Sequence, residues 1–124
     1  MKIQGKHFVI TGGGSGLGAA TAEYLVEKGA SVTLVDMNVE AGEQQAQALG
    51  EKAEFVKLDV TDEQAAEQFF QDVVAKHGCL HGLVNCAGIG PSAKVIAKES
   101  VHDLAMFSKT LQINVTGTFN MLRF

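Results

Sequence analysis

The chain has 124 residues, a length that allows one domain or part of one. Its composition, 46% hydrophobic and 19% charged, is ordinary for a globular α/β protein, and its net charge of −4 argues against the basic surface that nucleic acid requires. We expect neither a signal peptide nor a membrane span, because no apolar segment follows Gln4 and no apolar run approaches roughly 20 residues. With Cys79 and Cys86 as its only cysteines, the chain predicts no disulfide framework and favours a reducing, cytoplasmic location with small-molecule partners.

Short apolar runs alternate with helical stretches along the chain. The predicted strands span 7–11, 31–35, 54–58 and 82–85. The predicted helices span 16–28, about 39–49 after an Asn38 cap, 61–77 from a capping box that begins at Thr61, and about 101–124 from a Ser100 cap. Glycines follow the ends of the first three helices, as they commonly do at helix C-termini. Residues 88–98 are predicted to form a loop.

This βα alternation predicts a parallel sheet with helices on both faces, joined by right-handed crossovers. The expected strand order is 3-2-1-4, most of a doubly wound, three-layer α/β sheet. Since no linker divides the sequence, we expect residues 1–124 to belong to one domain.

The last predicted helix is apolar nearly all round. Its apolar residues are, near one face, Leu104, Phe107, Leu111, Val115 and Leu122, and on other faces, Met106, Ile113, Met121 and Phe124. Because the sheet covers only one side, we expect a second subunit of a homo-oligomer, a dimer or tetramer, or further chain to cover the rest. The helix reaches Phe124 without a stop signal, which favours truncation of a longer protein.

A glycine-rich run, Thr11-Gly12-Gly13-Gly14-Ser15-Gly16-Leu17-Gly18, lies between the first strand and the first helix. Glycines lack the Cβ atoms that would block a ligand, and a helix N-terminus offers free N–H groups and a partial positive charge. The run therefore predicts a pyrophosphate site, and with it a Rossmann-type dinucleotide-binding fold.

Asp36 ends the second strand, about 18 residues after Gly18, near the spacing of a carboxylate that binds the adenosine ribose. A carboxylate there repels the 2′-phosphate of NADP, and Met37 after it brings no positive charge to bind that phosphate. We therefore expect NAD as the cofactor. A second role for Asp36, as an acid at the start of the next helix beside Asn38, stays open.

The chain resembles the short-chain dehydrogenase/reductase family over essentially its whole length. Thr11 to Gly18 matches the family's T-G-x-x-x-G-x-G motif, and Asp59-Val60 resembles its adenine-contacting pair. Asn85-Cys86-Ala87-Gly88 is similar to its N-N-A-G motif, with Cys86 in place of the second Asn, and Asn114 occupies the place of its catalytic-tetrad asparagine. Within the family, the run from Asn85 most resembles the type 2 3-hydroxyacyl-CoA dehydrogenases.

The resemblance implies a role for each matching residue. The cofactor-binding residues that it implies are Gly12, Ser15, Gly16, Leu17, Gly18, Asp36, Asp59, Val60, Asn85, Cys86, Ala87 and Gly88. Thr11 is expected to bond a neighbouring strand, and Asn85 has an equal claim to a purely structural role between strands. Cys86 is expected to be a small buried residue rather than a reactive thiol. Asn114 is the implied catalytic residue, which binds a water of a proton relay; its alternative is to fill a polar gap in the helix.

The family's reaction is hydride transfer between a nicotinamide and a secondary alcohol or ketone, here suggestive of a 3-hydroxyacyl-CoA. Its proton-transferring Tyr-x-x-x-Lys pair and upstream Ser would follow Phe124. The string from Tyr24 to Lys28 has that spacing but lies on the first helix, and we interpret it as helix surface. The resemblance thus implies an NAD-dependent oxidoreductase whose first 124 residues are inactive alone, and a non-catalytic dinucleotide-binding fragment or module is the alternative.

One further group of residues could suggest a metal. His77, Cys79 and His81 lie close together in the sequence. The ligand count is short and the segment crosses a helix end, so we expect no metal site.

Overall fold

The computed structural model describes residues 2–124 and contains one parallel sheet. Its strands lie in the order β3-β2-β1-β4, which confirms the predicted order. The strands are β1 (His7–Thr11), β2 (Ser31–Asp36), β3 (Ala53–Lys57) and β4 (Gly82–Asn85). The predicted strand boundaries differ from these by at most one residue.

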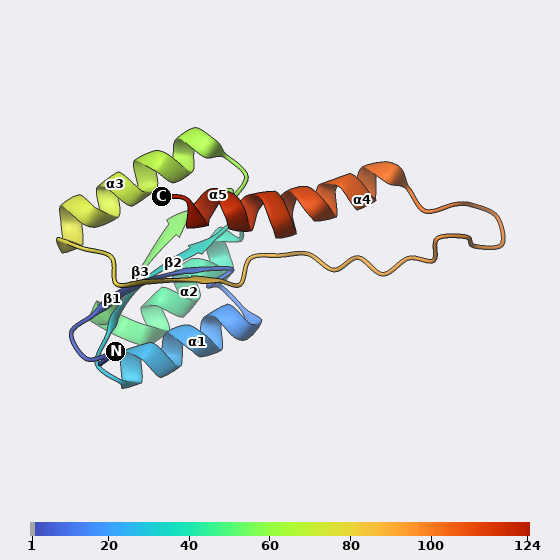
Figure 1. The fold of residues 1–124 in the computed structure, drawn as a ribbon. Coiled ribbons are helices and arrows are strands. Elements are labelled where there is room, and N and C mark those ends of the chain that lie inside the picture. Colours follow the sequence, from blue (N-terminus) through green and yellow to red (C-terminus); the bar gives the residue numbers. More distant parts are fainter. Residues whose placement is uncertain (1) are drawn as a thin grey trace.

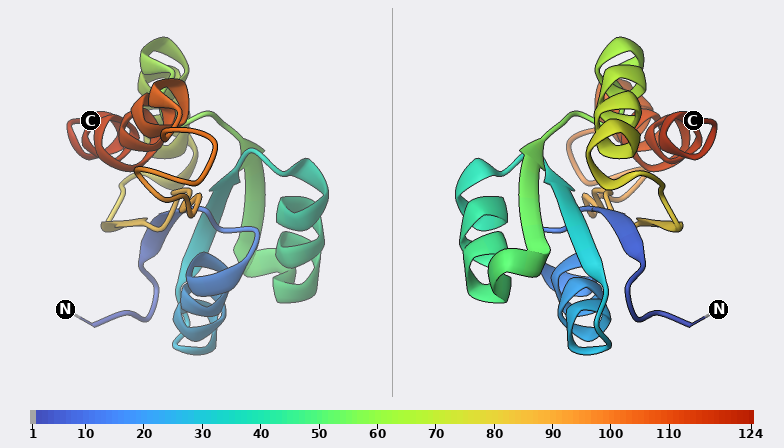
Figure 2. Two further views of the ribbon diagram at one scale, coloured as in Figure 1. Left: turned by 90° about the vertical axis from the view of Figure 1, so that its right-hand side faces the viewer. Right: turned by 90° about the vertical axis from the view of Figure 1, so that its left-hand side faces the viewer.

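The helices form two layers around this sheet (Figure 1). They are α1 (Gly16–Glu27), α2 (Val39–Leu49), α3 (Glu63–His77), α4 (Leu104–Leu111), a π-helical segment (Gln112–Gly117) and α5 (Thr118–Leu122), with a short 3-10 turn (Gly50–Lys52) before β3. Figure 2 shows α1 and α2 on one face of the sheet and α3 with the C-terminal helices on the other. The predicted three-layer α/β architecture is therefore confirmed.

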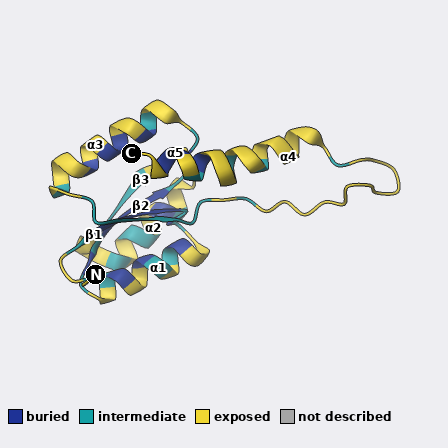
Figure 3. Cartoon of the chain, in the orientation of Figure 1, coloured by how far each residue is buried: buried dark blue, intermediate teal, exposed yellow. Residues whose placement is uncertain are grey.

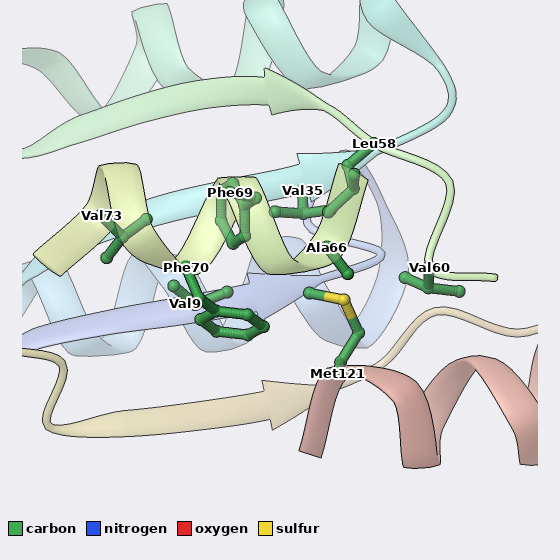
Figure 4. Packing of buried hydrophobic residues seen from close by; sticks show 9 residues of the cluster. All are labelled: Val9, Val35, Leu58, Val60, Ala66, Phe69, Phe70, Val73 and Met121. Carbon is green, nitrogen blue, oxygen red and sulfur yellow. The ribbon is translucent and has the colours of Figure 1, made fainter. Parts of the chain in front are cut away.

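Each inner strand buries side chains on both faces, which is why the strands are nearly continuous apolar runs in the sequence. One face packs against α1 and α2; its buried core is Phe8, Ile10, Ala22, Leu25, Ala30, Val32 and Leu34. The opposite face packs against α3 and α5; its buried core is Val9, Val35, Leu58, Val60, Ala66, Phe69, Phe70, Val73 and Met121. Figure 4 shows this second cluster, with Met121 pointing from α5 toward α3.

Two predicted helix caps are wrong by one and by three residues. The cap of α3 is Asp62, whose Oδ1 accepts a hydrogen bond from the Ala65 N–H at 2.9 Å. The Thr61 side chain instead turns back to Asp59, and its hydroxyl donates to Asp59 Oδ1 at 2.7 Å. In the same way α4 is capped by Asp103 rather than Ser100, through the Ala105 N–H.

The last helix is continuous from Leu104 to Leu122 but changes to π-helical hydrogen bonding in its middle. Its α4 part and the preceding loop project beyond the sheet (Figure 1), and α4 is almost wholly exposed (Figure 3). Exposed apolar side chains from this region are Val95, Ile96, Val101, Leu104, Met106, Phe107, Leu111, Val115, Phe119, Leu122 and Phe124. The sheet thus covers one side of the helix only, as predicted.

Among residues 2–124, no helix is both long enough and apolar enough to cross a bilayer.

Candidate cofactor-binding site

The glycine-rich turn after β1 brings three pieces of backbone close together. A methyl group at Gly12 would lie 2.8 Å from the backbone of Cys86 and Ala87, and one at Gly18 would collide with the Gly12 carbonyl oxygen. Gly12 and Gly16 also have positive φ angles of 65° and 53°, which L side chains rarely adopt. Gly16 itself has open space around it, so the turn leaves room for a ligand at the start of α1.

That turn forms one wall of a cavity of about 620 Å³ at the carboxyl ends of β1, β2 and β4. In doubly wound sheets this is the end at which ligands bind. The lining residues are Gly12, Ser15, Gly16, Leu17, Gly18, Val35, Asp36, Met37, Leu58, Asp59, Val60, Cys86, Ala87, Gly88, Ile89, Lys109 and Ile113. All the residues that the resemblance implied for cofactor binding are among them except Asn85.

Asp36 lies at the cavity with its carboxylate held by two backbone N–H groups. Oδ2 accepts from Gly14 at 3.0 Å, and Oδ1 accepts from Asn38 at 3.0 Å. The carboxylate therefore ties the glycine turn to the start of α2, which is the second role that the sequence left open. A carboxylate in two such bonds is fixed in orientation and still has lone pairs for a ligand.

Asp59 holds the second acidic position on the cavity wall. Its Oδ1 accepts from the Thr61 N–H at 2.9 Å and from the Thr61 hydroxyl. The only cation on the cavity lining is Lys109 of α4, one helical turn before Ile113. The charged residues of the cavity lining are thus two acids and one base, and the N-terminus of α1 adds a partial positive charge.

Thr11 acts within the protein, as the sequence predicted. Its Oγ1 accepts from the Cys86 N–H and the Ala87 N–H, each at 3.1 Å, so it fixes the chain that leaves β4. Asn85 does not line the cavity, and its Oδ1 is the one buried side-chain oxygen or nitrogen without a hydrogen-bond partner in residues 2–124. An unpaired buried acceptor costs free energy, so the Asn85 side chain contributes less to stability than a fully hydrogen-bonded one would.

Asn114 also binds backbone rather than lining the cavity. Its Oδ1 accepts from the Ile89 N–H and its Nδ2 donates to the Ile89 carbonyl, both at 2.8 Å. It lies in the π-helical segment, and Thr118 donates to the Asn114 carbonyl oxygen. Asn114 therefore fixes the Gly88–Ile89 wall of the cavity.

Two further residue groups that the sequence analysis set aside lie outside the cavity. Tyr24 lies on α1 and Lys28 directly after it, with the Lys28 Nζ 5.4 Å from the centre of the Tyr24 ring. In the group of His77, Cys79 and His81, Cys79 Sγ lies 3.3 Å from His81 Nε2. His77 contacts Glu54 instead, with its Nε2 2.8 Å from Oε1.

Glu54 and His77 form a tight group with His7. Their possible metal-ligating atoms lie within 4.8 Å of one another. The two imidazole rings are stacked, with centroids 3.7 Å apart and planes 12° apart, so their in-plane lone pairs cannot converge on one ion. The geometry is that of a hydrogen-bonded cluster, and the predicted lack of a metal stays a prediction.

Six lining residues escaped the sequence analysis. They are Val35, Met37, Leu58, Ile89, Lys109 and Ile113. The helical spacing of Lys109 and Ile113 puts them on one face, but nothing local says that this face closes over the glycine turn. Contacts with distant parts of the chain determine that: the packing of Met121, the bonds between Asn114 and Ile89, and the bond from Asn120 to the Val60 carbonyl.

Comparisons with known proteins agree with this arrangement. The family model described as short chain dehydrogenase matches residues 6–124. The chain is 42% identical to human 3-hydroxyacyl-CoA dehydrogenase type-2 over 123 residues, which are 98% of this chain and 47% of that protein. It is 43% identical to the Drosophila melanogaster protein of the same name over 93% of this chain and 46% of that one.

A relative with another name is a 2,5-dichloro-2,5-cyclohexadiene-1,4-diol dehydrogenase of Sphingobium indicum, 38% identical over 98% of this chain and 48% of that protein. The chain therefore spans about half the length of the curated relatives that it matches. With its motifs placed around one cavity and the family model matching almost every residue, the chain belongs to the short-chain dehydrogenase family.

Proposed function

We propose that this chain is the NAD-binding part of an oxidoreductase that transfers a hydride between a nicotinamide and a secondary alcohol or ketone. The observation that carries the proposal is Asp36, a carboxylate fixed at the cavity by Gly14 and Asn38. It is placed to accept from the ribose hydroxyls of NAD and would repel the 2′-phosphate of NADP. Lys57, its neighbour on β3, lines a different cavity.

The remaining lining residues suit the rest of the dinucleotide. The N–H groups at the start of α1, beside Ser15 and Leu17, would bind the pyrophosphate. Asp59 and Val60 would flank the adenine, and Cys86 to Gly88 would run beside the second ribose and the nicotinamide. When bound, the nicotinamide supplies the hydride chemistry.

The substrate that we propose is a 3-hydroxyacyl-CoA or another small hydroxy compound. Its support is the likeness to proteins named 3-hydroxyacyl-CoA dehydrogenase type-2. The wider class of hydroxy compounds is included because a diol dehydrogenase has a similar sequence identity to this chain. We further propose that the Ser, Tyr and Lys needed for proton transfer come from a following half of the protein. The only tyrosine of these 124 residues lies outside the cavity.

A non-catalytic dinucleotide-binding module is the second candidate, favoured because Tyr24 does not line the cavity. Turnover of a 3-hydroxyacyl-CoA by the whole protein, followed by the change in NADH absorbance, separates the two candidates. Turnover supports the enzyme; tight NADH binding without turnover of any secondary alcohol supports the module.

The cofactor assignment is tested by titrating NADH and NADPH into the protein and its Asp36→Ala variant. We expect NADH to bind more tightly than NADPH, and the variant to lose about tenfold or more in NADH affinity because hydrogen bonds to a charged acceptor are lost. The ratio of the NADPH and NADH Kd values should fall toward one. Asp72→Ala, an exposed acid on α3, is the matched control. Equal loss for both cofactors would reduce Asp36 to a structural role.

We also propose a homo-oligomer that uses the exposed apolar side of α4 and α5, and a reducing location such as the cytoplasm for the two free cysteines. Leu111→Glu with Phe119→Glu should lower the molar mass found by analytical ultracentrifugation, while Val74→Glu on α3 should not. An unchanged mass would exclude this helix from the interface.

A further inference from the structure

A second polar cluster lies at the other end of the sheet from the cofactor cavity. It joins His7 of β1, Thr33 of β2 and Glu54 of β3 to the end of α3, with Lys76 and His77. The loop into β4 adds His81. None of these residues has a part in the proposed function, yet His7 is 4% exposed and every polar atom of its ring has a partner.

The hydrogen bonds of the cluster run in one direction. Thr33 donates its single hydroxyl proton to Glu54 Oε1 at 2.8 Å, so its oxygen must accept from His7 Nε2 at 3.0 Å. The His7 ring therefore carries a proton on Nε2, and in the neutral ring Nδ1 accepts from the Ser31 hydroxyl at 2.8 Å. The contact between Thr33 and Glu54 thus assigns the tautomer of the neutral His7 ring.

Glu54 is the acceptor at which the cluster ends. It receives hydrogen bonds from Thr33, His77 and Lys76. Burial by itself raises its pKa, but these three donors outweigh burial and lower the pKa to about 2. The carboxylate is thus charged and anchors the last turn of α3 to β2 and β3.

The surroundings of His7 resist a second proton. Burial lowers the pKa of His7 from 6.5 to about 4, and the stacked ring of His77 adds to this effect. Glu54 opposes the shift, while His81 and Lys76 reinforce it. Cys79, next to the His81 ring, is the remaining titratable neighbour.

His81 joins the start of β4 to β1 through two hydrogen bonds. The His7 N–H donates to His81 Nδ1 at 3.0 Å, and the His81 N–H donates to the His7 carbonyl at 2.9 Å. Because Nδ1 accepts here, the proton of the His81 ring is on Nε2. This pair extends the β1–β4 pairing by one residue before Phe8 and Gly82.

We propose that His7, Glu54, His77 and His81 form an acid-sensitive lock, which holds the end of α3 and the start of β4 to the sheet while His7 is neutral and releases them when His7 takes up a proton. Opening exposes His7 to water, where it takes up a proton more readily than in the cluster. Acid therefore favours the open state by linkage. Because β4 leads directly into Cys86, Ala87 and Gly88 of the cofactor cavity, cofactor binding should oppose the opening.

Hydrogen exchange read by mass spectrometry tests the lock at pH 7.5 and 5.5, with rates corrected for the intrinsic effect of pH. Opening of residues 76–84 should increase about tenfold at pH 5.5, as expected for a histidine whose pKa rises from about 4 to 6.5 on opening, while residues 31–36 remain protected. His7→Gln keeps a donor for Thr33 without titrating, and His81→Asn keeps an acceptor for the His7 N–H. His7→Gln should abolish the increase, both alone and combined with His81→Asn.

The matched control is His102→Asn, because His102 lies outside the cluster, bonded to the Asp103 carbonyl. It should keep the full increase. An increase that survives in the double variant, that spreads equally over residues 31–36, or that is absent from the wild type would overturn the proposal. Should the variants not fold, proton NMR titration of the wild-type histidines decides: His7 must take up a proton as residues 76–84 open, and opening without its protonation would refute the lock.

Discussion

Three polar side chains around the cavity use their hydrogen bonds to hold backbone in place. Thr11 fixes the chain after β4, Asp36 ties the glycine turn to α2, and Asn114 fixes Ile89. The cavity walls are loops, which have few backbone partners of their own, so single side chains determine their shape. Changes at such residues should therefore affect cofactor affinity as much as stability.

Gly18 offers a direct test of close packing in the turn. Gly18→Ala places a methyl group against the Gly12 carbonyl oxygen. Overpacking of this kind costs about 1–3 kcal/mol, and we expect denaturant unfolding to show a loss in that range together with weaker NADH binding. Gly90→Ala is the control, since nothing lies within 4 Å of a methyl group there. Equal stability of the two variants would mean that the turn adapts.

Substitution of Asn114 tests whether its two hydrogen bonds to the Ile89 backbone are needed for cofactor binding. Asn114→Ala removes two hydrogen bonds of 2.8 Å, and we expect NADH to bind about tenfold more weakly, since each bond contributes on the order of 1 kcal/mol. Isothermal titration calorimetry measures the change. Gln112→Ala, two residues earlier on the exposed helix surface, should bind NADH as the wild type does. Unchanged binding in Asn114→Ala would confine its role to a later step.

At the scale of elements, α3 and α4 begin where an aspartate can reach their free N–H groups. The cap of α3 is Asp62, directly after Thr61, and the cap of α4 is Asp103, three residues after Ser100. The hydroxyl of Thr61 is engaged by Asp59 of the cavity wall, so the start of α3 and the cofactor site share one hydrogen-bonded turn. The capping-box pattern was present in the sequence, but the Asp62 carboxylate is the group that reaches the Ala65 N–H, while the Thr61 side chain turns back to Asp59.

The cap of α3 can be tested by a pair of substitutions. Asp62→Ala should lower the free energy of unfolding by about 1 kcal/mol, because the Ala65 N–H loses its acceptor. Thr61→Val, which leaves that cap intact, should cost less. Urea denaturation followed by circular dichroism measures both. A larger loss for Thr61→Val would restore the capping box predicted from the sequence.

On the scale of the whole molecule, the sheet has two ends with different roles. The cofactor cavity lies at the carboxyl ends of β1, β2 and β4, and the histidine cluster lies at the opposite end, on the side of α3. The first end is open to a ligand, while the second is filled by its own hydrogen bonds. The acid sensitivity of the molecule is therefore concentrated away from the cofactor.

The pH dependence of stability follows from the two displaced pKa values of that cluster. The pKa of His7 is lower in the folded protein, about 4 against 6.5, so its contribution is complete above pH 6.5 and is lost as the pH falls toward 4. The pKa of Glu54 is also lower, about 2 against 4.5, so its contribution is lost between pH 4.5 and 2. Calorimetry should show Tm decreasing in these two successive steps.

Glu54→Gln should remove the second step and also lower Tm at pH 7 by roughly 8 °C, for about 2 kcal/mol of lost charged hydrogen bonds. Glu43→Gln on the exposed side of α2 is the control and should melt as the wild type does at every pH. A single step in the wild type, or an unchanged lower step in Glu54→Gln, would contradict this assignment.

Local pattern was enough to predict the elements, because the strands are short apolar runs bounded by glycines and the helices carry caps and C-terminal glycines. It also indicated the glycine turn and Asp36, and the family resemblance supplied most of the remaining cavity lining. Neither identified Lys109 or Ile113, which reach the cavity because contacts of Met121, Asn114 and Asn120 with distant residues hold the helix in place.

By itself the sequence determined the strand order, the helix layers and the glycine turn, because these depend on periodicity and on the conformations that glycine permits. Tertiary structure alone decided that Asn114 and Asp36 bind backbone, that Asn85 stays outside the cavity, and that His7 and His77 stack. Hydrogen bonds between residues far apart in the chain depend on positions to within an ångström, and only the packed sheet and helices set those positions.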